Sequence, residues 1–266
     1  MRRPFTIGIG GTRSGSGKTT AASSLLKILA EKNNFSAIGQ KDISSSIQSK
    51  LKPVRRWGAI KYSKTEFYSS ITVESEILGE LGKDTHRLME AGAEEVVWVQ
   101  SPTEVLDEVM PIALERLYHL DGILIEGNSA IEFVKPDVIV LVSGGGSMEI
   151  KPSAWKILEN ADIIIMSYDS PLINYPDSLK NSKVFTLRDF QEGISGGIIK
   201  EVIDYMDILV NMKRAKELLI ERSVDQKITC GDARKIAEET GLPYYEVGRI
   251  ADDLKVKIRD CELGCF

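Results

Sequence analysis

The amino-acid sequence predicts a doubly wound α/β fold with a mostly parallel sheet, followed by a small helical module. Three observations support this fold class. Short apolar runs recur along the chain, with helical patterns between many of them. These runs are nearly continuous in apolar residues, as in strands that are buried on both faces. The first run leads directly into a glycine-rich loop and a helix, so we expect the ligand at the carboxyl ends of the strands.

The expected elements follow one another in the order that crossover connections need. Helices are expected at residues 21–30, 101–119, 151–160 and 196–220, and strands at residues 5–10, 35–40, 96–99, 122–125, 137–142, 162–166 and 183–187. Residues 50–73, basic and aromatic at first, are expected to form a β-hairpin insertion beside the site. Two interpretations of this hairpin remain open: a lid that grips a second anionic substrate, or a solvated hairpin with extended lysines.

A phosphate-binding loop follows the first expected strand. Glycines in the loop let successive backbone N–H groups point inward, and the next helix adds the positive end of its dipole. We expect Lys18 to reach the terminal phosphates and the Thr19 hydroxyl to bind Mg²⁺. The usual motif has glycine where this chain has Thr12. The strand, loop and helix together predict a P-loop NTPase fold, with phosphate binding by Ser14, Gly15, Ser16, Gly17, Lys18, Thr19 and Thr20.

Two acidic residues at expected strand ends are candidates for metal and catalytic roles. Asp42 follows the second expected strand, and Glu126 ends the run at 122–125. We expect each to bind Mg²⁺ directly or through water, or to orient the attacking water while Lys18 stabilises charge. The alternative for both is a structural acid that caps a turn or strand. The residue types at Asp84 and Thr85 leave helix capping and nucleotide sensing equally open.

The identity of the base is left open by the sequence. Asp169 follows the expected strand at 162–166, where guanine-specific proteins carry an Asn-Lys-x-Asp motif. The Asn-Lys part is absent here. Asp169 is therefore predicted to contact the base, while the sequence does not choose between GTP and ATP.

Residues 196–266 are predicted to form a separate helical module, after a nucleotide-binding domain at residues 1–195. The stretch 233–254 has helix-turn-helix spacing, with Gly241 in the turn. Acidic side chains such as Asp252 on its second helix would face phosphates unfavourably. We therefore expect a packing or partner-binding module rather than a DNA-binding one.

All three cysteines lie in this last part of the chain. They are Cys230, Cys261 and Cys265. Three thiolates would suit a soft metal or a cluster, and the alternative is that they are buried or simply free. Their odd number does not suggest a disulfide framework.

Composition excludes several classes of protein. The 266 residues carry a net charge of −5, which gives no overall basic signature for nucleic acid. No apolar stretch reaches membrane-spanning length. The apolar run after the basic start ends at the phosphate loop, so we expect no signal peptide. These observations favour a cytoplasmic protein without a membrane partner.

Three blocks of the sequence together resemble the molybdopterin-guanine dinucleotide biosynthesis protein B (MobB) family. They are residues 14–20, 82–93 and 123–127, and the resemblance covers about residues 5–142. It implies a GTP-binding adapter with weak hydrolysis that assists molybdenum or tungsten cofactor assembly, usually as a homodimer with a cofactor-assembly protein as partner. It also implies phosphate binding by the loop and a metal-proximal role for Glu126.

Three other functions remain as alternatives. The first is an NTPase that matures another metal centre, which the cysteines would favour. The second is a small-molecule kinase with residues 50–73 as its lid. The third is a nucleotide-sensing regulator that uses the helix-turn-helix. Arg13 is a candidate arginine finger reaching across a dimer, and a solvent-facing Arg13 is the alternative.

Overall fold

The computed structural model describes residues 3–35, 56–144, 149–188, 194 and 196–260. The described residues divide into two compact units, a larger one that ends at Ile203 and a smaller one that begins at Asp204. Helix α7 (Gly196–Arg222) has residues in both. The predicted domain boundary between residues 195 and 196 stays a prediction.

An eight-stranded sheet forms the centre of the larger unit. Its strand order is β3-β4-β2-β5-β1-β6-β7-β8, and all neighbours are parallel except the pair of β3 and β4. The predicted fold class, a mostly parallel α/β sheet with C-terminal helices, is confirmed. The strands are β1 (Phe5–Gly11), β2 (Trp57–Lys64), β3 (Ser70–Thr72), β4 (Glu95–Ser101), β5 (Gly122–Glu126), β6 (Val138–Ser143), β7 (Ile163–Ser167) and β8 (Lys183–Leu187).

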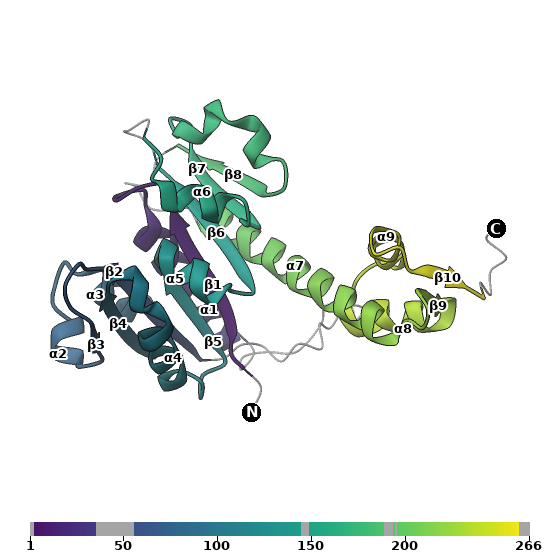
Figure 1. Cartoon of the computed structure of the whole chain (residues 1–266), viewed down its shortest axis with the longest axis horizontal. Coiled ribbons are helices and arrows are strands. Elements are labelled where there is room, and N and C mark those ends of the chain that lie inside the picture. Colours follow the sequence, from purple (N-terminus) through teal and green to yellow (C-terminus); the bar gives the residue numbers. More distant parts are fainter. Residues whose placement is uncertain (1–2, 36–55, 145–148, 189–193, 195, 261–266) are drawn as a thin grey trace. The chain divides into compact units, whose positions relative to one another are not determined.

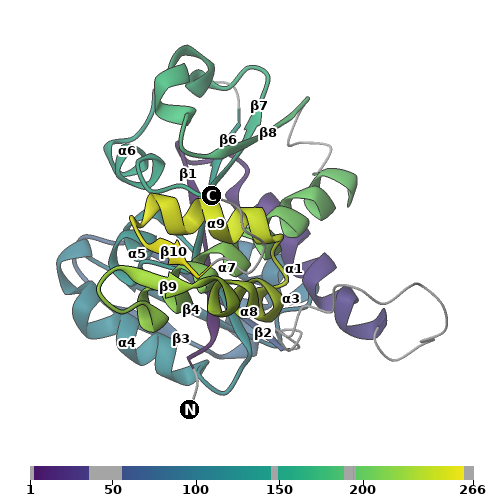
Figure 2. The ribbon, with the colours of Figure 1, turned by 90° about the vertical axis from the view of Figure 1, so that its right-hand side faces the viewer.

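Helices cover both faces of this sheet (Figures 1 and 2). Along the parallel strands the chain moves in one direction across the sheet from β1 through β2 to β4 and in the other from β4 to β8, and right-handed crossovers therefore place the connecting helices on opposite faces. One face carries α1 (Lys18–Phe35) and α3 (Asp84–Glu90), which contact each other; the other carries α4 (Leu106–Arg116), α5 (Asn128–Val134) and α6 (Pro152–Leu158). Short helical segments are α2 (Ser75–Leu78), Thr103–Val105, Pro171–Asn174 and Pro176–Leu179.

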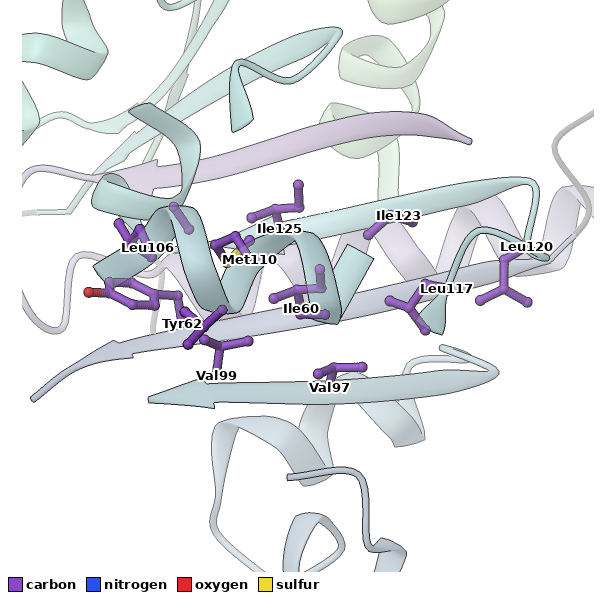
Figure 3. Packing of buried hydrophobic residues seen from close by; sticks show 13 residues of the cluster. Ile60, Tyr62, Val97, Val99, Leu106, Met110, Leu117, Leu120, Ile123 and Ile125 are labelled. Carbon is purple, nitrogen blue, oxygen red and sulfur yellow. The ribbon is translucent and has the colours of Figure 1, made fainter. Parts of the chain in front are cut away.

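The apolar core between α4 and the central strands shows which strand residues point toward α4 and which point toward the opposite face of the sheet. Alternate residues of β2, β4 and β5 point toward α4, among them Ile60, Val97 and Ile123 (Figure 3). Each fully buried aliphatic side chain of this kind contributes about 1.5–3 kcal/mol. Because side chains alternate along a strand, Lys61 of β2 points to the opposite face, where α1 and α3 lie.

Of the two predictions about this region, the hairpin was wrong, and the strand at residues 35–40 is tested only at its first residue. Phe35 is the last residue of α1, so it does not begin a strand, and residues 36–40 lie outside the described residues. Residues 57–64 form β2, a parallel strand between β4 and β5, rather than one arm of a hairpin. Strand β3 pairs with β4 instead of β2. The polar residues Lys61 and Ser63 interrupt the apolar run of β2, which is why the pattern looked like a solvated hairpin.

The smaller unit contains the predicted helix-turn-helix. Its elements after α7 are β9 (Lys227–Thr229), α8 (Cys230–Thr240), α9 (Tyr244–Asp253) and β10 (Lys257–Arg259). Gly241 ends α8 in the left-handed conformation with φ 70°, which glycine adopts without steric cost. Ala237 and Val247 are buried in one apolar cluster with Leu219 of α7. Within the described residues, no helix combines the length and apolar character needed to cross a bilayer.

Candidate functional site

The glycine-rich loop between β1 and α1 has the backbone geometry of an anion-binding nest. Gly15 and Gly17 have φ values of 73° and 94°, a region in which other residues are strained. The Lys18 ammonium group folds back over the loop and donates to the carbonyl of Arg13 at 3.1 Å. Burial lowers the pKa of Lys18, an effect that the nearby Glu126 carboxylate partly offsets. The loop thus surrounds a partly desolvated lysine.

Ser16 marks the inside of the loop. Its hydroxyl is buried and has no hydrogen-bond partner among the described residues, although buried polar groups are normally paired. A Cβ atom on Gly11 would lie 2.2 Å from this hydroxyl, so glycine is required beside it. An unpaired buried donor within a nest of backbone amides fits a phosphate oxygen.

Side chains and backbone amides from three neighbouring segments hold the loop in place. Asn128 of α5 accepts from the Gly11 amide at 2.9 Å and donates to the Gly11 carbonyl at 3.0 Å. The amides of Gly144 and Lys151 donate to the carbonyls of Ser16 and Thr12 at 3.0 and 2.9 Å. The buried Thr12 hydroxyl lies 3.1 Å from the Ser143 hydroxyl, so threonine replaces the usual glycine to tie the loop to β6.

A cluster of charged side chains lies next to the loop. The Thr19 hydroxyl lies 3.0 and 3.1 Å from the two carboxylate oxygens of Glu126. The Lys61 ammonium group lies 2.5 Å from Glu126 and 2.6 Å from Asp84. The Glu126 side chain is fully buried, and the Lys61 side chain is 13% exposed. Four elements, α1, β2, α3 and β5, therefore contribute to one polar cluster.

Lys61 and Asp84 shift each other's pKa values. Burial would lower the pKa of Lys61, but Glu126 and Asp84 outweigh burial and raise it. Burial would likewise raise the pKa of Asp84, but the Lys61 ammonium outweighs burial and lowers it. The Lys61 ammonium group and the Asp84 carboxylate thus stabilise each other's charged forms.

The residues of this cluster fit a magnesium ion. Mg²⁺ prefers hard oxygen ligands such as carboxylates, hydroxyls and phosphates. Thr19, Asp84 and Glu126 offer one hydroxyl and two carboxylates, and an ammonium group already lies between the two acids. The chemistry of this donor set matches the ion that accompanies nucleotide phosphates.

Several predicted site residues come together, and others do not. Lys18, Thr19 and Glu126 meet at the loop, and the Ser14 hydroxyl accepts from Lys151 at 3.0 Å. The Thr20 hydroxyl accepts from Arg87 of α3 at 3.1 Å, so it faces α3. Asp42 lies outside the described residues, and its metal and catalytic roles stay predictions.

Three further predictions remain untested. Asp169 is exposed in the turn after β7, and its contact with the base stays a prediction. The Nε atom of Arg13 is buried without a hydrogen-bond partner among the described residues, which leaves its role as an arginine finger a prediction. Cys230 is half-buried, whereas Cys261 and Cys265 lie outside the described residues. Across the described residues, no group of three or more His, Cys, Asp or Glu side chains is arranged to hold a metal.

Sequence reasoning missed Lys61 as a residue of the site and left Asp84 undecided. Lys61 stands beside Glu126 in the register of β2 and β5, which becomes visible only when β2 is placed in the sheet. Asp84 does not cap α3, since Lys83 is the N-cap residue and no side chain caps this helix end. A lysine in the middle of an otherwise apolar strand was the available signal.

No protein-family model and no curated protein matches the chain. Among solved structures it is similar to chloroplast FtsY from Physcomitrella patens, with 13% identity over 76% of this chain and 66% of that chain and a TM-score of 0.37. It is also similar to "apo" form LpxK from Aquifex aeolicus in complex with ATP, with 14% identity over 69% and 53% and a TM-score of 0.35. The chain spans less than two thirds of either protein.

The chain's own architecture defines its class. The parallel sheet, its strand order, and the glycine-rich loop between β1 and the N-terminus of α1 make the larger unit an α/β domain of the P-loop type.

Proposed function

We propose that this protein binds a nucleoside triphosphate with Mg²⁺ at the carboxyl end of its sheet and hydrolyses it slowly. One observation carries the proposal: the hydroxyl of the residue after the loop lysine, Thr19, lies 3.0 Å from the buried carboxylate of Glu126. A glycine-rich loop alone is only a turn. A loop that leads into Lys18, Thr19 and a buried acid has the groups that phosphates and their metal ion need.

The chain's residues have distinct roles in this proposal. The loop amides and the unpaired Ser16 hydroxyl hold phosphate oxygens, and Lys18 neutralises the terminal phosphates. Thr19, Asp84 and Glu126 would hold Mg²⁺, which when bound neutralises phosphate charge. Glu126 is already engaged by Thr19 and Lys61. Because Glu126 would hold Mg²⁺ in the loaded site instead of activating water, we expect slow turnover without a partner.

We further propose a MobB-like role: a GTP-binding adapter in molybdenum or tungsten cofactor assembly, acting as a homodimer with an assembly protein. The support is the position of block 82–93, which carries much of the resemblance. This block begins α3 and brings Asp84 to Lys61. The Thr85 hydroxyl donates to the Leu78 carbonyl at 2.7 Å, and a Cβ on Gly92 would lie 2.9 Å from Ala30 of α1. A family-like block therefore packs against the helix that carries Thr19.

Titration calorimetry with GTP and ATP, each with and without Mg²⁺, tests the nucleotide proposal. We expect Mg²⁺-dependent binding of at least one triphosphate, with GTP tighter than ATP, and no binding by Lys18→Ala. Lys83→Ala is the matched control because Lys83 pairs with Glu80 outside the cluster. Unchanged affinity in Lys18→Ala would exclude this site.

A second candidate function is a small-molecule kinase. It is favoured by Lys61, a second buried lysine beside Lys18 that an acceptor's anionic group would suit. An adapter consumes nucleotide slowly without any acceptor and retains a partner protein in a pull-down. A kinase consumes ATP only when its acceptor is added. Fast hydrolysis by the chain alone would contradict the adapter proposal.

A further inference from the structure

The ammonium group of Lys61 lies where the proposed metal site needs a cation. Its nitrogen is 2.5 Å from Glu126 and 2.6 Å from Asp84, and the Thr19 hydroxyl lies 3.0 Å from the same Glu126 carboxylate. These are the oxygen atoms that Mg²⁺ would bind. Lys61 and a metal ion therefore compete for the same ligands.

The sheet fixes Lys61 in this position. Lys61 is paired in register with Glu126 across the parallel strands β2 and β5, and β2 is held on its other side by β4. Asp84 is the first residue of α3, and Thr19 lies in the first turn of α1. Because Lys61 projects from a strand that is paired on both sides and not from a loop, its ammonium group stays within the site.

We propose that Lys61 is an internal counter-cation that keeps the site closed to free Mg²⁺ until a nucleotide arrives. The inference rests on the proposed function, since it assigns regulation to that site. A divalent ion on Asp84 and Glu126 would meet the ammonium charge at close range, and two like charges in a buried site repel strongly. Phosphates give Lys61 another anionic partner, which frees the carboxylates.

It follows that metal and nucleotide bind with strong positive coupling, and that Lys61 sets much of this coupling. Coupling between two ligands is reciprocal, so metal raises nucleotide affinity by the factor by which nucleotide raises metal affinity. Lys61 is a positioning residue in this account. It acts through the carboxylates and takes no part in bond breaking.

Binding of Mn²⁺ to the nucleotide-free full-length chain, followed by electron paramagnetic resonance, tests the proposal. We expect Lys61→Met to bind Mn²⁺ about tenfold more tightly than wild type. Lys83→Met is the matched control: it removes a lysine that pairs with Glu80, and it should bind Mn²⁺ as wild type does. Equal Mn²⁺ affinity in wild type and Lys61→Met would overturn the proposal.

The same titration with a non-hydrolysable triphosphate measures the coupling itself. Wild type should gain much more Mn²⁺ affinity from the nucleotide than Lys61→Met gains. A role of Lys61 that is only structural would not change this ratio, and an unchanged ratio would contradict the proposal. If wild type binds no nucleotide, the proposed function fails, while the comparison of the nucleotide-free proteins still decides the role of Lys61.

Loss of Lys61 leaves the buried Glu126 without its cation, and unpaired buried charges are strongly destabilising. If Lys61→Met does not fold alone, we expect millimolar Mg²⁺ without nucleotide to restore a cooperative melting transition, because the metal takes the place of the ammonium. Failure of Mg²⁺ to restore the fold would count against the proposal.

Discussion

The two ends of the sheet use acidic residues in opposite ways. At the amino end, Asp121, Asp137 and Asp162 each directly precede a strand. Each accepts a hydrogen bond from a backbone amide of the neighbouring strand or its approach, at 2.9, 2.8 and 2.9 Å. At the carboxyl end, the Glu126 carboxylate accepts hydrogen bonds from the side chains of Thr19 and Lys61, and among the described residues no backbone amide donates to it.

The difference separates acids that build the sheet from an acid that can exchange partners. A backbone amide cannot leave an acid without breaking the strand, so the amino-end carboxylates are fixed. A hydroxyl and an ammonium group on side chains can move away when a ligand arrives. Position at the end of an apolar run is therefore not enough to identify a functional acid. An acid bound by backbone amides is structural, whereas an acid bound by side-chain donors can bind a ligand instead.

Lys18→Ala should have the largest effect at the carboxyl end. We expect nucleotide affinity to fall about 100-fold or more, which corresponds to about 3 kcal/mol for a lost charge-assisted contact. Calorimetry measures the affinity. The free energy of unfolding should stay close to that of wild type, because burial already disfavours the charged lysine. A large loss of stability without loss of nucleotide affinity would mean that Lys18, like the acids at the amino end, stabilises the fold and does not bind the ligand.

Glu126→Gln should come second. The amide keeps the size of the side chain but loses the charge that Mg²⁺ and Lys61 require. We expect Mg²⁺-supported nucleotide affinity or turnover to fall about 10- to 100-fold, while binding in the presence of a chelator changes little. Equal losses with and without Mg²⁺ would show that Glu126 acts on the loop and not on a metal.

Asp137→Ala is the matched change at the amino end. It removes the acceptor for both the Thr6 amide and the Thr6 hydroxyl, each at 2.8 Å. We expect the free energy of unfolding to fall by about 2 kcal/mol, with nucleotide affinity unchanged. Urea denaturation followed by tryptophan fluorescence measures this, since all three tryptophans lie in the larger unit. A loss of nucleotide affinity would contradict the proposal that acids at the amino end of the sheet are only structural.

Arg3→Ala should have the smallest effect. Arg3 pairs with Asp137, but its side chain is 66% exposed, and exposed ion pairs contribute about 0–1 kcal/mol. We expect a loss below about 0.5 kcal/mol in the same urea experiment. A loss as large as that of Asp137→Ala would mean that the ion pair, and not the backbone hydrogen bond, anchors this acid.

The sequence was sufficient for those parts of the fold that local pattern determines. Strands such as β1 and β5 are apolar runs, and the phosphate loop has a distinctive spacing of glycines. Strand β2 was missed because Lys61 and Ser63 interrupt its pattern, and their burial depends on partners far away in the sequence. Glu126 was found because it ends an apolar run. The contact between Lys61 and Asp84 arises only when β2 and α3 are assembled.

The backbone bonds that join the loop to the segment after β6 offer a direct readout of occupancy. The amides of Gly144 and Lys151 donate to Ser16 and Thr12, so their exchange with deuterated solvent depends on whether the loop is ordered. A bound ligand that orders the loop should slow deuterium uptake at both amides. Mass spectrometry of peptides that cover residues 144 and 151, cut from the otherwise unlabelled protein after exchange, would then detect the ligand with neither a dye nor an assay of turnover.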